Sequence, residues 1–159
     1  MRSCYERAEA LCHSHGGPRL LYVALMGQWR YSFATDKLTA AMQIAKRIYS
    51  LAEEQNDSAL KMGACQALTS TLYFSGDFES ARRCATRCVQ IWRPGDLPSP
   101  VEEVIAPVVV CLCYQALAEW HFGEITSCRA TMAKAIALAK ERADTHASAE
   151  ALFFAAILA

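Results

Sequence analysis

The stretch Phe78-Glu-Ser-Ala-Arg-Arg-Cys-Ala-Thr-Arg-Cys-Val-Gln-Ile-Trp92 decides the fold. Its apolar grid consists of Phe78, Ala81, Ala85, Cys88 and Trp92. The steps between these residues are three, four, three and four, which places all the side chains on one face of an α-helix. The stretch therefore predicts an amphipathic helix.

The same grid occurs twice more in the chain. Forty residues earlier it reads Leu38, Ala41, Ala45, Ile48 and Ala52, and forty-seven residues later it reads Ile125, Cys128, Met132, Ala135 and Ala139. Each copy follows a short break, at Thr35-Asp36, Gly76-Asp77 or Gly123-Glu124, and another apolar helical stretch precedes each break. A repeat of about forty residues made of two helices is typical of an α-solenoid, in which units bury their faces by stacking. We therefore predict an all-α fold, an α-solenoid of antiparallel helix pairs that forms a right-handed superhelix.

These patterns divide the chain, taken as a single repeat domain over 1–159, into units. The expected divisions are a half unit at 1–17, units at 18–56, 57–100 and 101–143, and a half unit at 144–159. The expected helices span about 19–34, 36–55, 58–75, 77–92 and 124–142, with further helical stretches at 5–12 and 149–158. Solenoids normally close with a polar capping helix, and the last stretch is apolar. We therefore expect the sequence to be a fragment of a longer protein.

Two details of these helices depend on single residues. Asp36 is expected to be the N-cap of the helix that follows it. Residues 93–100 hold three of the five prolines, which predicts an inter-unit loop. Pro107 either opens the next helix or kinks one that began near Val101, and both alternatives are compatible with the sequence.

Composition excludes several classes of protein. A hydrophobic content of 53% over 159 residues predicts a folded chain, and sixteen basic side chains balance sixteen acidic ones. We therefore expect no nucleic-acid or membrane partner. The longest apolar run, 104–114, is short of the ~20 residues that span a bilayer, and the charged N-terminus does not resemble a signal peptide. The expected location is cytoplasmic.

The eight cysteines are interpreted mainly as reduced thiols in the core, because most of them occupy helical apolar positions. A zinc set is the less favoured alternative, because strong zinc motifs place their cysteines in loops. Its members would be Cys84, Cys88, Cys111, Cys113, Cys128 and His121. We expect neither a metal nor another cofactor.

The charged and nucleophilic residues show no catalytic pattern. Arg82, Arg83, Arg87 and Arg93 form a basic strip, which is interpreted as a solvated helix face with Glu79 paired to Arg83. The four histidines are scattered, and no Ser or Cys nucleophile lies at a motif spacing from a histidine and an acid. The protein is therefore predicted not to be an enzyme.

Within each unit the turn and the residues after it resemble the tetratricopeptide repeat, whose central motif is matched by Gly76-Asp77-Phe78-Glu79-Ser80-Ala81. Longer units of this kind resemble the superhelical sensor domains of bacterial STAND-type signalling ATPases. More specifically, five segments look like the C-terminal repeats of large predicted ATPases that are often fused to adenylate or guanylate cyclase domains. These segments are 25–30, 51–57, 73–77, 120–123 and 135–139.

The resemblance implies a regulatory or scaffold module without catalytic activity of its own. Proteins of this kind carry their nucleotide chemistry upstream, and this sequence contains no Gly-x-x-x-x-Gly-Lys-Ser/Thr phosphate loop. The implied function is protein binding in signal transduction, and the implied partner is a protein, a peptide or upstream domains of the same polypeptide.

The tetratricopeptide resemblance also implies a binding surface, because the first helices of such units line a concave groove. The matching positions are Tyr22, Leu25, Trp29, Phe33, Gln66, Ser70, Tyr73, Phe74, Cys113, Leu117, Trp120 and His121. Aromatic residues there would suit an extended peptide or a helix. The alternative is that longer helices shift the register and bury these rings between units.

Three further hypotheses remain open. The region of Trp29, Tyr73, Phe74 and Trp120 could instead enclose an apolar effector, which would make the chain a small-molecule sensor with an inter-repeat pocket. The chain could also be a purely architectural spacer. Finally, apolar helices at the two ends, near Leu11 and across Leu152–Leu158, could pair between copies in a homodimer.

Overall fold

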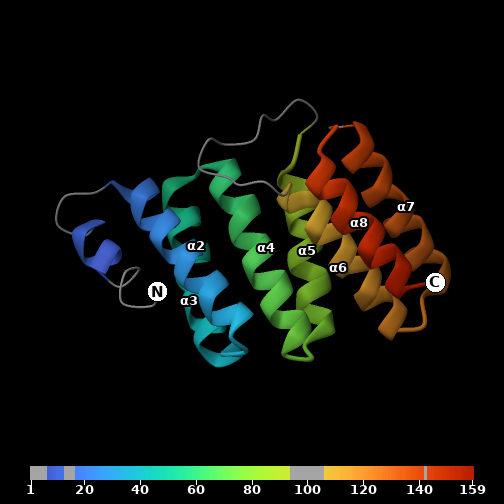
Figure 1. The fold of residues 1–159 in the computed structure, drawn as a ribbon, viewed down its shortest axis with the longest axis horizontal. Coiled ribbons are helices and arrows are strands. Elements are labelled where there is room, and N and C mark those ends of the chain that lie inside the picture. Colours follow the sequence, from blue (N-terminus) through green and yellow to red (C-terminus); the bar gives the residue numbers. More distant parts are fainter. Residues whose placement is uncertain (1–6, 13–16, 94–105, 142) are drawn as a thin grey trace.

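The computed structural model describes residues 7–12, 17–93, 106–141 and 143–159, and every regular element in these ranges is an α-helix. A short helix covers 7–12. It is followed by α2 (Pro18–Ala34), α3 (Leu38–Gln55), α4 (Ser58–Phe74), α5 (Phe78–Ile91), α6 (Pro107–His121), α7 (Ile125–Glu141) and α8 (Thr145–Ile157). The prediction of an all-α chain is confirmed. Figure 1 shows the helices standing side by side in an elongated row, from blue at one end to red at the other.

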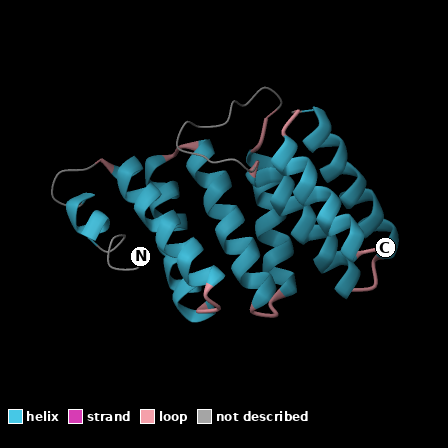
Figure 2. Cartoon of the chain, in the orientation of Figure 1, coloured by secondary structure: helices cyan, strands magenta, loops and turns pink. Residues whose placement is uncertain are grey.

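Three tight turns of the same design join α2 to α3, α4 to α5 and α6 to α7 (Figure 2). One residue in each turn has a left-handed backbone: Asp36 with φ 57°, Gly76 with φ 82° and Gly123 with φ 75°. The N–H of the residue after it donates a hydrogen bond to the carbonyl five positions back, over 2.8, 3.0 and 2.9 Å respectively. This bond satisfies one of the carbonyls that a helix end leaves without a partner.

The expectation that Asp36 caps the next helix is wrong. Lys37 occupies the N-cap position of α3, and no side chain caps that helix. Asp36 instead takes the left-handed place that glycine fills in the other two turns. Asp tolerates this backbone better than most residues with a Cβ, because its short polar side chain can bond locally.

The starts of the other helices are set by aspartate and proline. Asp57 accepts hydrogen bonds from the N–H groups of Ala59 and Leu60, over 2.9 and 3.3 Å, at the start of α4. Aspartates cap α5 and α8 in the same way. Pro107 opens α6, and Ala106 before it is extended with ψ 113°, which decides between the two alternatives for this proline.

The small residues of the repeated grid are fully buried between helices. Ala41, Ala45, Ala81, Ala85 and Ala135 all have 0% exposure. In the described ranges from α2 to α8, consecutive helices contact one another, and α2, α4, α6 and α8 also contact one another in that order. The buried residues form two clusters, one centred on α2 and α3 and a larger one on α4 to α8.

None of the helices in the described part of the chain combines the length and the hydrophobicity needed to cross a membrane. The segment 94–105, which contains most of the predicted inter-unit loop, lies outside the described residues, as does Cys4. The seven cysteines inside the described ranges carry free thiols.

The cap at Asp57 predicts a specific loss of stability in acid. Burial opposes ionisation of this carboxyl, but hydrogen bonds from Arg19 and from the Leu60 and Ala59 N–H groups outweigh it and lower its pKa below 3.8. The charge therefore stabilises the fold above that value, and the stabilisation is lost as the pH falls through the lowered pKa. In urea unfolding, wild type should lose stability more steeply below pH 3.8 than Asp57→Asn, which keeps a capping side chain.

The control for this experiment is Asp36→Asn, because Asp36 is exposed and caps no helix. Its unfolding free energy should follow the wild-type pH dependence. Equal pH dependence of wild type and Asp57→Asn would contradict the role of the Asp57 charge.

Candidate partner-binding surface

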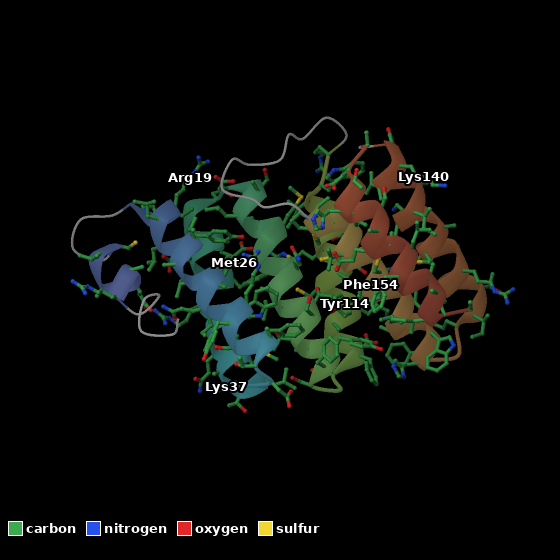
Figure 3. All side chains as sticks on the ribbon, viewed as in Figure 1. Arg19, Met26, Lys37, Tyr114, Lys140 and Phe154 are labelled. Carbon is green, nitrogen blue, oxygen red and sulfur yellow. The ribbon has the colours of Figure 1, made fainter. Side chains whose placement is uncertain are left out.

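Aromatic side chains from four helices form one continuous row of ring contacts, which we call the aromatic row. Its members are Trp29 and Phe33 of α2, Phe74 of α4, Tyr114 of α6 and Phe154 of α8. Successive centroids lie 5.3, 5.3, 6.1 and 5.1 Å apart, and three of the four contacts are edge-on. Tyr114 and Phe154 can be followed in Figure 3. The row links every second helix across the molecule.

A second group of rings, which we call the His121 cluster, consists of Tyr73, Phe78, Trp120 and His121. It contacts the aromatic row at Phe74. The imidazole of His121 stacks on Phe78 with 4.0 Å between centroids and 9° between planes. The Tyr73 hydroxyl lies 3.0 Å from His121 Nε2, and Trp120 contacts the imidazole edge-on at 5.2 Å. The cluster therefore connects the C-terminal ends of α4 and α6 with the start of α5.

Exposure divides these rings into a buried part and an accessible part. Trp29 is 5% exposed, whereas Phe74 is 55% and Trp120 is 50% exposed. Phe153 of α8, which contacts Phe154 at 5.6 Å, is 62% exposed. Phe74 and Phe153 rest on less exposed rings, Phe33 and Phe154 respectively, whereas Trp120 rests on the exposed imidazole of His121. Each of these accessible rings contacts a neighbouring ring while part of it remains open. A surface of this kind can contact apolar groups at a small loss of side-chain entropy.

The twelve residues that the sequence suggested for a groove lie in three different environments. Phe74, Trp120 and His121 are exposed, and Phe33, Gln66 and Tyr73 are half-buried. The remaining six belong to the core: Tyr22, Leu25, Trp29, Ser70, Cys113 and Leu117. Periodicity places all twelve on the first helices, but it carries no information on how far each side chain reaches past its neighbours.

Trp29 is held in the core by a polar contact as well as by packing. Its indole N–H donates to Thr71 Oγ1 of α4 over 2.9 Å, and the Thr71 hydroxyl donates to the Ala67 carbonyl over 2.7 Å. Thr71 is 0% exposed. The indole therefore satisfies its one donor inside the protein and ties α2 to α4.

Several rings of this surface were missed by sequence reasoning, including Tyr114, Phe122, Phe153 and Phe154. The repeat does not signal them, because the rings that meet in the row occupy different places on their helices. Phe74 is the last residue of α4, whereas Tyr114 lies in the middle of α6.

The basic strip on α5 is paired with acidic residues from three helical segments. Arg82 contacts Glu79 at 2.8 Å and Glu124 at 3.0 Å, and Arg87 contacts Glu53 of α3 at 2.8 Å. The predicted pair of Glu79 with Arg83 is confirmed, at 3.4 Å. These exposed pairs leave little uncompensated positive charge on α5, and each contributes little to stability.

The arginines also cover aromatic rings. The Arg82 guanidinium lies 4.8 Å from the centre of the Phe122 ring, and that of Arg87 lies 5.3 Å from the centre of Tyr49. Burial raises the pKa of Tyr49 to about 12, although Arg87 works against the shift. Within the described ranges, no three His, Cys, Asp or Glu side chains are arranged to hold a metal ion.

A small cleft of about 180 Å³ lies between α5, α6 and α7, away from the aromatic row. It is lined by Val89, Trp92, Val108, Leu112, Lys134, Ala137, Leu138 and Glu141. The Nε1 atom of Trp92 is buried and has no hydrogen-bond partner among the described residues. The lining is mainly apolar, with the charged side chains of Lys134 and Glu141, and it differs from the residues that the sequence suggested for an effector pocket.

Comparison with known proteins assigns no relative to the chain. The sequence matches no protein-family model, and it has no significant match among curated proteins.

The two tryptophans of the surface should respond very differently to truncation. Trp29→Ala removes a buried ring and leaves Thr71 without its donor, so it should lower the free energy of unfolding by ~3 to 5 kcal/mol. Trp120→Ala removes a half-exposed ring and should cost less than about 1.5 kcal/mol. Urea unfolding followed by circular dichroism measures both, and similar losses for the two variants would contradict this division into core and surface.

Proposed function

We propose that this chain is a non-catalytic helical-repeat module that binds a protein or peptide through its exposed aromatic surface. In this proposal the helices form an α-solenoid of antiparallel pairs in a right-handed, tetratricopeptide-like superhelix. Two features support it: from α2 to α8, consecutive helices contact one another and α2, α4, α6 and α8 also contact one another in that order, and the turns after α2, α4 and α6 have the same design. Both features are expected when identical units stack in one direction.

The observation that carries the binding proposal is the accessibility of Phe74 and Trp120 at the end of a rigid ring network. Both are about half exposed, at 55% and 50%, and each contacts further rings at 5.2 to 6.1 Å. Soluble proteins seldom gather large exposed rings without a use, and aromatic anchors commonly provide most of the energy of an interface.

The biological setting is proposed from the resemblance stated above. In that setting the chain is the regulatory or scaffold segment of a bacterial signalling ATPase, acts in the cytoplasm and needs no cofactor. Its partner is a protein, a peptide or upstream domains of the same polypeptide, and it is neither a nucleic acid nor a membrane. Leu152, Phe153 and Ile157 of α8, exposed by 54%, 62% and 57%, offer a face through which two copies could also pair.

Selection from a displayed library of random peptides tests this proposal directly. Wild type should enrich peptides with apolar anchors, and Trp120→Ala should weaken their binding at least about tenfold, because removing a central anchor costs more than about 1.4 kcal/mol. Titration of a labelled selected peptide measures the dissociation constants.

Leu20→Ala is the matched control, because Leu20 is 60% exposed on α2 but belongs to neither ring group. It should bind the selected peptides like wild type. Failure to enrich any peptide, or equal binding by Trp120→Ala, would count against a peptide-binding surface here.

The cleft between α5, α6 and α7 favours a second candidate function, sensing of a small apolar effector. Its volume of about 180 Å³ is below the usual range for drug-sized ligands, so it would suit a small, largely apolar effector. This candidate uses a different part of the molecule from the aromatic surface, so the two can be tested separately.

Native mass spectrometry of the protein purified from cells tests the sensor candidate. A bound effector adds mass that disappears on denaturation, and Ala137→Trp should abolish this added mass by filling the cleft from its exposed rim. Ala133→Trp on the same helix is the control, because Ala133 is exposed but does not line the cleft. A spectrum of the unliganded mass alone, or added mass retained by Ala137→Trp, would leave the peptide-binding function as the only supported one.

A further inference from the structure

Four cysteine thiols meet where α4, α5 and α6 pack together: Cys65 from α4, Cys84 and Cys88 from α5, and Cys111 from α6. Their S–H groups make weak hydrogen bonds within this region. Cys84 donates to the Cys65 carbonyl over 3.6 Å and Cys88 donates to the Met62 carbonyl over 3.7 Å. Cys111 donates to the hydroxyl of Thr69 over 3.9 Å.

The contact of Cys84 with Cys65 brings cysteines of two neighbouring helices together, with 3.6 Å between the Cys84 sulfur and the Cys65 carbonyl oxygen. Cys88 and Cys111 belong to the same apolar cluster. Within the described residues the thiols are not arranged as a metal site. The chemistry open to neighbouring thiols is then oxidation in pairs.

Cys84 differs from the other three in access to solvent. Cys65, Cys88 and Cys111 have 0% exposure, whereas Cys84 is partly exposed. Of the four residues, Cys84 is therefore the one that an oxidant dissolved in water meets at the surface of the folded protein. Oxidants react preferentially with cysteines that are both exposed to solvent and able to form a thiolate.

Electrostatics point in the same direction as access to solvent. The neighbouring Cys65 side chain lowers the pKa of Cys84 against the opposing effect of burial, and the Thr69 hydroxyl and the Arg87 guanidinium add to the lowering. The neighbouring Cys84 side chain, together with burial, raises the pKa of Cys65. Cys84 must release the proton that it donates to the Cys65 carbonyl before it can attack, and as the partly exposed thiol of the pair it is the nucleophile.

We propose that Cys84 and Cys65 form a peroxide-sensitive dithiol site that closes to a disulfide between α4 and α5. The Cys84 sulfur attacks one oxygen of hydrogen peroxide, the O–O bond breaks, and the released hydroxide takes a proton to become water. The sulfur of Cys65 then attacks the sulfenic acid on Cys84. The S–S bond forms, the S–O bond breaks, and the Cys65 proton leaves with the hydroxyl group as a second water. Two thiols are oxidised by two electrons, and one peroxide is reduced to two waters.

The packing of α4 on α5 suits this cross-link. A disulfide needs Cα atoms within about 7 Å, which side-by-side helices reach only where small residues allow close approach. Ala81 and Ala85, on either side of Cys84 along α5, both have 0% exposure. The two helices are also joined by one tight turn, so they are already aligned when the oxidant arrives.

Peptide mapping after peroxide treatment of the native, reduced protein tests the proposal. Wild type should lose the mass of two hydrogen atoms and yield one cross-linked peptide that contains Cys65 and Cys84. Cys65→Ser should instead stop at a sulfenic acid on Cys84, which a carbon nucleophile such as dimedone labels. Cys84→Ser should give no such disulfide.

Cys88→Ser is the matched control, because it removes a buried thiol one turn further along α5 and should leave the Cys65–Cys84 cross-link intact. The wild-type map alone can overturn the proposal, whatever the variants do. Two results for peroxide-treated wild type would falsify it. In the first, both thiols are still free for alkylation after denaturation. In the second, oxidation occurs first at Cys12 or between Cys88 and Cys111.

Discussion

The close approach of paired helices through alanine and cysteine is the constraint on which the rest of this structure depends. Ala41, Ala45, Ala81, Ala85 and Cys88 have 0% exposure, and they lie on the narrow apolar faces of α3 and α5. Side chains this small let the backbones come near one another, so the larger apolar groups are placed on the first helices instead. Helix α6 shows the result, because it is buried on most of its surface. A larger residue at any of the alanine positions would force the helices apart.

Contacts between the rings of the first helices form a second set of links between helices. The aromatic row runs from α2 through α4 and α6 to α8, so it connects helices that are not consecutive in the sequence. Ion pairs make further links, such as Arg87 with Glu53 between α5 and α3 and Arg19 with Asp57 between α2 and the start of α4. Exposed pairs of this kind contribute little energy, so the aromatic surface has the greater capacity to bind an apolar partner.

The positions of the exposed rings and of the reactive thiol follow from the same packing. Phe74 and Trp120 lie at the C-terminal ends of α4 and α6, where the chain turns away and no following helix covers them. Cys84 lies at the edge of the contact between α4 and α5, where its neighbour Cys65 is fully covered. Phe74 and the thiol pair both use α4, so binding at this ring and oxidation at the thiols would affect the same helix, whereas Trp120 lies on α6.

The sequence by itself determined that the chain is helical and where most of the described helices approximately begin and end, because a period of 3.6 residues and breaks at Gly76 and Gly123 are local properties. It also predicted the contact between Glu79 and Arg83, which depends only on their spacing in one helix. The tertiary structure decided how exposed or how deeply buried each side chain is. Trp29 and Trp120 look alike in the pattern, yet one is 5% and the other 50% exposed. The burial of a ring depends on which helix lies over it, and the meeting of four thiols from three helices depends on how those helices stack. Neither can be read from the spacing of residues along one helix.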